Sequence, residues 1–118
     1  MDYMLLLYAD PRGFETMSPS QAQETMAAYT AYTGALEKAG VLRGSNRLRP
    51  GPSASTVRLK SGKTEVLDGP YAETREELGG YYLIDVPDLD AALAWAARCP
   101  GASHGAVEVR PVWPHAMP

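Results

Sequence analysis

The run Tyr3-Met4-Leu5-Leu6-Leu7-Tyr8 constrains the fold of this chain more than any other segment. Six consecutive apolar or aromatic side chains, ended by the turn-forming Asp10-Pro11-Arg12-Gly13, predict a strand. Because successive side chains of a strand point to opposite faces of its sheet, this strand is apolar on both faces. Something must therefore pack on each side of the sheet.

A long helix is predicted after this strand. Ser18 is its predicted N-cap, Pro19 occupies the first helical position and Gln21 completes a capping box. Gly40 ends the helix where a left-handed residue is favoured. One core-facing stripe is predicted at spacings of four and three residues, made of Ala22, Met26, Tyr29, Thr33 and Leu36.

The rest of the chain predicts further strands and a second helix. Val41-Leu42 predicts a short strand, followed by an irregular connection over residues 43–53. Residues 56–60 and 63–67 flank Ser61-Gly62, which is a two-residue hairpin signal. Residues 81–86 and 107–110 are the last two predicted strands. Between them a helix over about residues 89–98 is capped by Asp88 or Asp90, with the main apolar side chains Leu89, Leu93 and Trp95.

This order of elements predicts one α+β domain over residues 1–118, with residues 111–118 as an irregular tail. Two βαβ-like halves around one antiparallel sheet give the ferredoxin-like split βαβ arrangement, with both helices on one face. Since the strand at residues 3–8 has no polar set of side chains, we expect a second copy to cover the other face. The expected assembly is a homodimer.

Composition excludes several classes of function. The net charge is −3, and the densest basic group, Arg43, Arg47 and Arg49, has no aromatic residues beside it for stacking bases, so we expect no nucleic-acid partner. No basic, apolar leader opens the chain and no apolar run approaches membrane-spanning length, so no membrane partner is expected. Cys99 is the only cysteine, which suits a reducing compartment. The expected location is the cytoplasm.

The most unusual segment is Asp68-Gly69-Pro70-Tyr71-Ala72-Glu73-Thr74-Arg75-Glu76-Glu77-Leu78-Gly79-Gly80. It resembles the signature of the YCII-related family in its DGPF-motif branch, with Tyr71 where that branch usually has phenylalanine. The opening strand, the long helix, residues 81–86 and the closing Val107-Glu108-Val109-Arg110 resemble the same branch in the same order. The resemblance implies a dimeric α/β barrel of ferredoxin-like subunits. It implies little about activity, because the family consists mainly of proteins without an assigned one.

Asp68 is the candidate catalytic residue, as a general acid or base at the mouth of a pocket. The alternative is an Asx turn, in which Asp68 only accepts hydrogen bonds from nearby backbone N–H groups. Gly69, Pro70 and Tyr71 would line the same site. Arg75 is a candidate for binding a substrate carboxylate, whereas Glu76 and Glu77 are expected on a solvated face. Gly79-Gly80 predicts either a bulge or a close approach of a ligand, and the bulge is favoured.

Glu108 and Arg110 project from one face of the last strand, as an ion-pair network or as the lining of the pocket. His104 and His115 are the only histidines, and neither has Cys or carboxylate neighbours at metal-ligand spacing. We therefore expect no metal. Motifs for nucleotide binding are also missing, so no cofactor is expected. The family that this chain resembles includes members with a histidine near the first helix, which is proposed to pair with an aspartate as a catalytic dyad. This chain has no histidine before His104.

Two functions follow from these observations. The first is a small-molecule-binding protein or small acid–base enzyme with a pocket near the Asp68 turn, acting on a compact polar or anionic metabolite. The second is a non-catalytic accessory or regulatory protein. The resemblance implies this role, because genes of the DGPF-motif branch often lie beside genes for extracytoplasmic-function sigma factors. A closed pocket at Asp68 favours the first function, and a flat exposed apolar patch favours the second.

Overall fold

The structure is a computed structural model that describes residues 1–114. Its helices and strands, in chain order, are β1 (Asp2–Ala9), α1 (Arg12–Glu15), α2 (Pro19–Lys38), β2 (Leu42–Arg47), the 3-10 turn η1 (Gly51–Ser53), β3 (Ser55–Lys60), β4 (Lys63–Asp68), β5 (Glu77–Asp85), α3 (Leu89–Arg98), α4 (Gly101–His104) and β6 (Ala106–Pro111). Within this part of the chain, no helix is long and apolar enough to cross a membrane.

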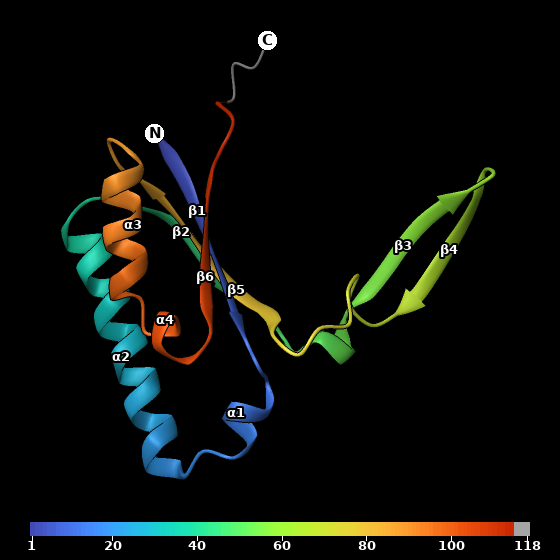
Figure 1. The fold of residues 1–118 in the computed structure, drawn as a ribbon, viewed down its shortest axis with the longest axis horizontal. Helices are drawn as coiled ribbons and strands as arrows, with labels where there is room; N and C mark the ends of the chain where they lie inside the picture. Colours follow the sequence, from blue (N-terminus) through green and yellow to red (C-terminus); the bar gives the residue numbers. More distant parts are fainter. Residues whose placement is uncertain (115–118) are drawn as a thin grey trace.

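Four strands form one antiparallel sheet in the order β2-β5-β1-β6. The helices α2 and α3 lie side by side on one face of this sheet, and the opposite face carries no helix (Figure 1). Strands β3 and β4 form a separate two-stranded sheet that projects from the side opposite the helices. The predicted α+β, ferredoxin-like arrangement is confirmed.

The core lies between the helices and the sheet. Leu5, Leu36 and Ile84 are fully buried there, one each from β1, α2 and β5. The Tyr32 hydroxyl donates a hydrogen bond of 2.7 Å to the Trp95 carbonyl oxygen, which ties α2 to α3. This core holds both helices on the sheet and so fixes the walls of the cleft described below.

The opposite face of the sheet, here called the open face, carries a second set of apolar side chains. They are only half-buried in one chain and come from two neighbouring strands: Met4, Leu6 and Tyr8 of β1, with Tyr81 and Leu83 of β5. The expectation that both faces of β1 are apolar is therefore correct for the chain itself. That a second copy of the chain covers the open face stays a prediction.

The start of α2 follows the predicted capping box. The Gln21 N–H donates to the Ser18 hydroxyl at 3.2 Å, and the Ser18 N–H donates to the Gln21 side chain at 3.0 Å. The predicted stripe is only partly correct, because Tyr32 and Leu36 are the buried residues and Met26 is 49% exposed. The first half of α2 runs past the end of the sheet (Figure 1), and Met26 lines a cleft instead of a filled core.

The second helix begins as predicted, with the Ala91 N–H donating to the Asp88 carboxylate at 2.9 Å. Two of its large apolar side chains, Leu89 and Leu93, are each 47% exposed. Ala92 and Ala96 are buried in their place. Their small side chains let the helix axis come close to the sheet, which leaves no room for leucine on that side.

Two segments are more regular than predicted. The short strand expected at residues 41–42 is β2, which continues to Arg47 because β5 supplies backbone hydrogen-bond partners along its whole length. The irregular connection therefore begins at Leu48. The expected tail is still strand at Pro111, and the Val112 N–H donates to the Asp2 carbonyl oxygen at 2.9 Å. Residues 115–118 of that predicted tail lie outside the described residues.

The predicted hairpin is confirmed as β3 and β4 joined by Ser61-Gly62, both of which have positive φ, 50° and 78°. This is the backbone conformation of the tight hairpin turns whose twist matches the strands. The predicted bulge at Gly79-Gly80 is confirmed too, because the β1–β5 register shifts between Leu7 and Tyr8. The hairpin stands apart from the core, and only its base joins the main sheet (Figure 1).

Candidate functional site

A cleft of about 660 Å³ lies between α2 and the strands β2 and β5. We call it the helix-side cleft. Its volume falls within the range of small-molecule sites. Its walls are α1, residues 26–37 of α2, the end of β2 and the start of β5, and they include Phe14, Met26, Tyr29, Thr33, Arg47, Glu77 and Tyr82.

Three hydroxyl groups line the inner end of this cleft. The Thr33 and Tyr82 hydroxyl oxygens are 2.9 Å apart and share a hydrogen bond. The Tyr29 hydroxyl lies against Gly101, where a Cβ atom would be only 2.9 Å from it, so glycine leaves room for that hydroxyl. Burial raises the pKa of Tyr29 to about 12 and also raises the pKa of Tyr82. All three groups are therefore neutral hydrogen-bond donors near pH 7.

Arg47 stands at the mouth of the cleft, on the last residue of β2. Its guanidinium carbon is 5.1 Å from the centre of the Phe14 ring, and Nη1 is 4.0 Å from the Met26 sulfur. Among residues 1–114, no carboxylate forms an ion pair with it. The cleft thus has an apolar wall, hydroxyl donors inside and a cation at the entrance.

Glu77 is half-buried in the wall of this cleft, which corrects the expectation that it lies on a solvated face. Its carboxylate accepts a hydrogen bond of 3.0 Å from the Gly51 N–H. A Cβ atom at Gly51 would lie 2.7 Å from that carboxylate, so a larger residue would force the Glu77 side chain to shift. Glu77 therefore fixes the turn η1 from which the hairpin departs, and sequence reasoning missed this role.

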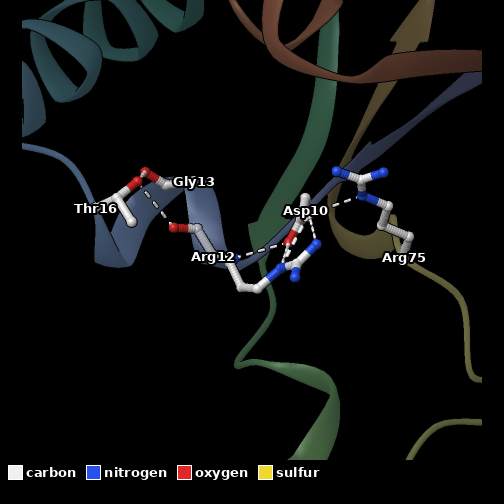
Figure 2. A network of polar contacts seen from close by, with 5 residues as sticks. All are labelled: Asp10, Arg12, Gly13, Thr16 and Arg75. Atoms are coloured by element: carbon white, nitrogen blue, oxygen red, sulfur yellow. Dashed lines mark hydrogen bonds and ion pairs between the residues drawn. The ribbon is translucent and has the colours of Figure 1, made fainter.

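A second, more open cavity of about 740 Å³ lies at the end of β1 and is called the Asp10 pocket. Figure 2 shows the Asp10 carboxylate between two guanidinium groups, with Arg12 at 2.7 Å and Arg75 at 3.4 Å. The hydrogen bonds from Arg12 hold the pKa of the Asp10 carboxyl well below its usual range. One carboxylate against two guanidiniums leaves this cluster net positive. Tyr8 and Asp10 line both cavities.

The structure separates the residues that the sequence grouped into one site. Asp68 is exposed at the end of β4, lines neither cavity, and its carboxylate accepts no hydrogen bond from residues 1–114, so the Asx-turn alternative is not observed. Gly69 turns the chain with a φ of 108°, and its N–H donates to Ala54 at 2.7 Å. Pro70 follows, half-buried, and Tyr71 is 78% exposed. The catalytic role of Asp68 stays a prediction.

The remaining predicted residues lie elsewhere. Arg75 lines the Asp10 pocket, as described above. Glu108 and Arg110 lie on the open face, where the Arg110 Nε donates to Glu108 at 3.1 Å and the Tyr8 hydroxyl donates to Glu108 at 3.2 Å. The ion-pair alternative for these two residues is the one observed. Within one chain, Asp68 lies on the hairpin β3–β4, whereas the network of Tyr8, Glu108 and Arg110 lies on the main sheet.

Of the two histidines, His104 is exposed at the end of α4, and His115 lies outside the described residues. Within residues 1–114, no three His, Cys, Asp or Glu side chains gather as a metal site would require.

Comparisons with known proteins agree with this architecture. The model of the YCII-related domain matches residues 1–116. The chain belongs to the YCII-related family. An uncharacterised protein of Rhizobium meliloti is 40% identical over 114 residues, which cover 95% of this chain and 92% of that protein.

A solved structure of similar fold is a 5-chloro-2-hydroxyhydroquinone dehydrochlorinase, TftG, from Burkholderia phenoliruptrix, in complex with 2,5-dihydroxybenzoquinone. The TM-score is 0.57, the identity is 13%, and the match covers 98% of this chain and 96% of the dehydrochlorinase. At this identity the likeness concerns the fold. The YCII-related chain thus has one uncharacterised relative and one enzyme of similar fold among its matches.

Proposed function

We propose that this YCII-related protein binds a small ring compound that carries an anionic oxygen, and that the helix-side cleft is the binding site. The compound class includes aromatic carboxylates and phenolates. The single cysteine, Cys99, is buried and agrees with a cytoplasmic place for this role.

The observation that carries the proposal is Arg47. A guanidinium without an anionic partner in the described chain, held over an aromatic ring at the entrance of an apolar cleft, is suited to a carboxylate or phenolate. The Phe14 ring and the Met26 thioether beside it offer apolar contact to a flat ring.

The inner hydroxyls complement such a ligand. Tyr29 and Tyr82 stay protonated near pH 7, so Tyr29 can donate a hydrogen bond to a ring oxygen that enters the cleft, and so can whichever hydroxyl of the Thr33–Tyr82 pair accepts the bond between them. Two groups of donors at opposite ends of an apolar wall would fix the orientation of a molecule with oxygens at both ends. The dehydrochlorinase of similar fold is bound to a ring with oxygens at opposite positions, which supports this ligand class.

The second predicted function, an accessory role linked to an extracytoplasmic-function sigma factor, stays a prediction. The helix-side cleft gives the small-molecule role its specific support.

The proposal is tested by thermal shift and titration calorimetry with benzoate, salicylate and 2,5-dihydroxybenzoate, and with benzyl alcohol as the uncharged comparison. A probe at a hundred times its dissociation constant stabilises the fold by about 2.7 kcal/mol. For a domain of this size that raises Tm by roughly 10 °C. We expect stabilisation by at least one anion and none by the alcohol.

The variant Arg47→Gln keeps a long polar side chain and removes the charge, and we expect it to weaken anion binding at least about tenfold, or 1.4 kcal/mol. Arg43→Gln is the matched control, because Arg43 lies on the same strand and pairs with Asp2 at 3.4 Å outside the cleft. Equal loss in both variants, or binding unaffected by Arg47→Gln, would place the site elsewhere.

A further inference from the structure

The Asp10 pocket and the helix-side cleft meet at the end of β1. Tyr8 and Asp10 line both cavities, so the two share one wall. This wall is polar, because it carries the Asp10 carboxylate and the Tyr8 hydroxyl, which donates to Glu108 at 3.2 Å. A ligand that lies along the shared wall therefore has one end in the cleft and the other end in the pocket.

The Asp10 carboxylate is already satisfied by Arg12. It accepts the Arg12 backbone N–H at 3.0 Å, the side-chain Nε at 3.1 Å and Nη2 at 2.7 Å. Both carboxylate oxygens take part in these bonds, which lower the pKa of Asp10 and keep it ionised near pH 7. Asp10 thus needs no further cation to balance its charge.

Arg75 is held much more loosely. The only hydrogen bond of its side chain within residues 1–114 runs from Nε to Asp10 at 3.4 Å, and Figure 2 shows this single dashed line. Its terminal nitrogens have no partner in that part of the chain, and the side chain is 82% exposed. Glu76 also lines the pocket, but among the same residues its carboxylate pairs with neither Arg75 nor Arg12. Arg75 therefore offers the paired N–H groups that a carboxylate accepts.

The backbone register shows how far apart the two cavities hold their cations. Arg47 and Leu7 both pair with Gly80, so they lie in one row across β2, β5 and β1. Two strand spacings of about 4.8 Å, and three residues of about 3.3 Å from Leu7 to Asp10, put the Cα atoms of Arg47 and Asp10 roughly 14 Å apart. A benzene ring with two opposite carboxylates, and a guanidinium beyond each, spans a similar length.

We propose that the two cavities are one binding site for a ring compound with carboxylates at opposite positions. Arg47 binds one carboxylate at the entrance of the helix-side cleft, and Arg75 binds the other in the Asp10 pocket. This inference rests on the ligand-binding role proposed above and names its ligand class. Asp10 limits the affinity, because its fixed negative charge lies beside the second carboxylate.

Titration calorimetry near pH 7 with three probes tests the spacing. Terephthalate has two opposite carboxylates, phthalate has the same charge on adjacent positions, and 4-methylbenzoate has a similar length and one charge. We expect terephthalate to bind about fivefold more tightly than 4-methylbenzoate, a modest gain because Arg75 is exposed. Phthalate is expected to show no such gain, because its adjacent carboxylates cannot reach both arginines.

The variant Arg75→Gln removes the second cation. We expect it to abolish the gain of terephthalate and to leave the binding of 4-methylbenzoate unchanged. Arg58→Gln is the matched control with the same loss of charge, because the Arg58 guanidinium lies 5.2 Å from the centre of the Tyr71 ring and lines neither cavity. This control is expected to bind all three probes like the parent.

The variant Asp10→Asn separates ligand binding from a purely structural contact between Asp10 and Arg75. Its amide keeps an oxygen for the Arg12 backbone N–H and loses the opposing charge. We therefore expect terephthalate to bind more tightly, and to gain more than 4-methylbenzoate does. If the contact only held the fold, Asp10→Asn and Arg75→Gln would instead weaken the binding of every probe alike.

The outcomes distinguish this inference from the proposal on which it rests. If 4-methylbenzoate binds through Arg47 and terephthalate gains nothing, or keeps its gain in Arg75→Gln, the helix-side cleft retains its ligand role and the second subsite is wrong. An equal gain for phthalate, an equal loss in Arg58→Gln, or weaker terephthalate binding in Asp10→Asn would also overturn the subsite. If none of the three probes binds, both proposals are wrong.

Discussion

The hydroxyl of Tyr29 offers a direct test of the helix-side cleft, because its pKa is raised by burial from about 10 to about 12. Between these pH values the unfolded chain loses the Tyr29 proton while the folded chain keeps it. The unfolded state then binds fewer protons, so the free energy of unfolding falls as pH rises. Tyr29→Phe removes this dependence, since phenylalanine does not titrate.

The size of the effect follows from the shift. Two pKa units correspond to about 2.7 kcal/mol. Because the Tyr29 side chain is only half-buried, solvent screening lowers this, and we expect about 1–2 kcal/mol. The stability that the parent has over Tyr29→Phe should therefore be constant below pH 10 and decrease by that amount as pH approaches 12.

Urea unfolding of the parent and of Tyr29→Phe across this pH range measures the difference directly. Tyr32 and Tyr82 also have pKa values raised by burial, and both titrate in the two proteins alike, so their contributions cancel in the comparison. A difference between parent and variant that does not change with pH would show that Tyr29 has an ordinary pKa. The cleft would then be more open to water than described, although the Tyr29 hydroxyl would still be a neutral donor near pH 7.

Two further predictions concern residues singled out by the sequence. Ser18→Ala is expected to lower the free energy of unfolding by about 1 kcal/mol in urea denaturation, because the Gln21 N–H loses its acceptor; a variant as stable as the parent would contradict the capping role. Asp68→Asn keeps the shape of the side chain and removes its charge, so the fold should be unchanged. Because Asp68 lines neither cavity, we expect the affinity for the anionic probes to be unchanged in titration calorimetry, and a clear loss of affinity would return Asp68 to the ligand site.

The elements predicted best from the sequence were those specified by local chemistry. The Ser18 capping box, the Ser61-Gly62 turn and the left-handed Gly40, with a φ of 73°, depend on a few adjacent residues. The pattern of β1 also predicted its two apolar faces correctly. Such features need no knowledge of distant parts of the chain.

The errors arose where distant contacts decide the outcome. In α3, the sequence showed the large apolar side chains Leu89 and Leu93 without saying which face is buried, and the short distance between helix and sheet selects Ala92 and Ala96 for the core. The strand β2 was cut short because Gly44 and Asn46 are weak strand formers alone, while pairing with β5 stabilises them. Sequence periodicity contains neither the helix-to-sheet distance nor the pairing partner.

In the candidate site too, the features that depend on neighbouring residues were predicted, and those that depend on distant contacts were not. Tyr29 and Thr33 were predicted on the inner stripe of α2 and are there, but the stripe gave no sign that a cleft lies between these residues and the strands β2 and β5. A stripe that combines hydroxyl side chains with Met26 could have suggested a pocket. Arg47 was counted only as part of a basic connection, because its contact with Phe14 joins residues 33 positions apart.

The Asp68 segment was identified by its unusual chemistry, and the structure changes what that chemistry implies. The segment begins at the base of an exposed hairpin, so the Asp68 carboxylate lies on a separate two-stranded sheet and not beside the residues of the main sheet that were expected near it. The sequence grouped Asp68, Arg75 and Arg110 by their unusual chemistry, and within one chain the structure places them on separate parts of the fold. Asp68→Asn decides whether the grouping matters for ligand binding, because it removes the charge and leaves both cavities of the single chain intact.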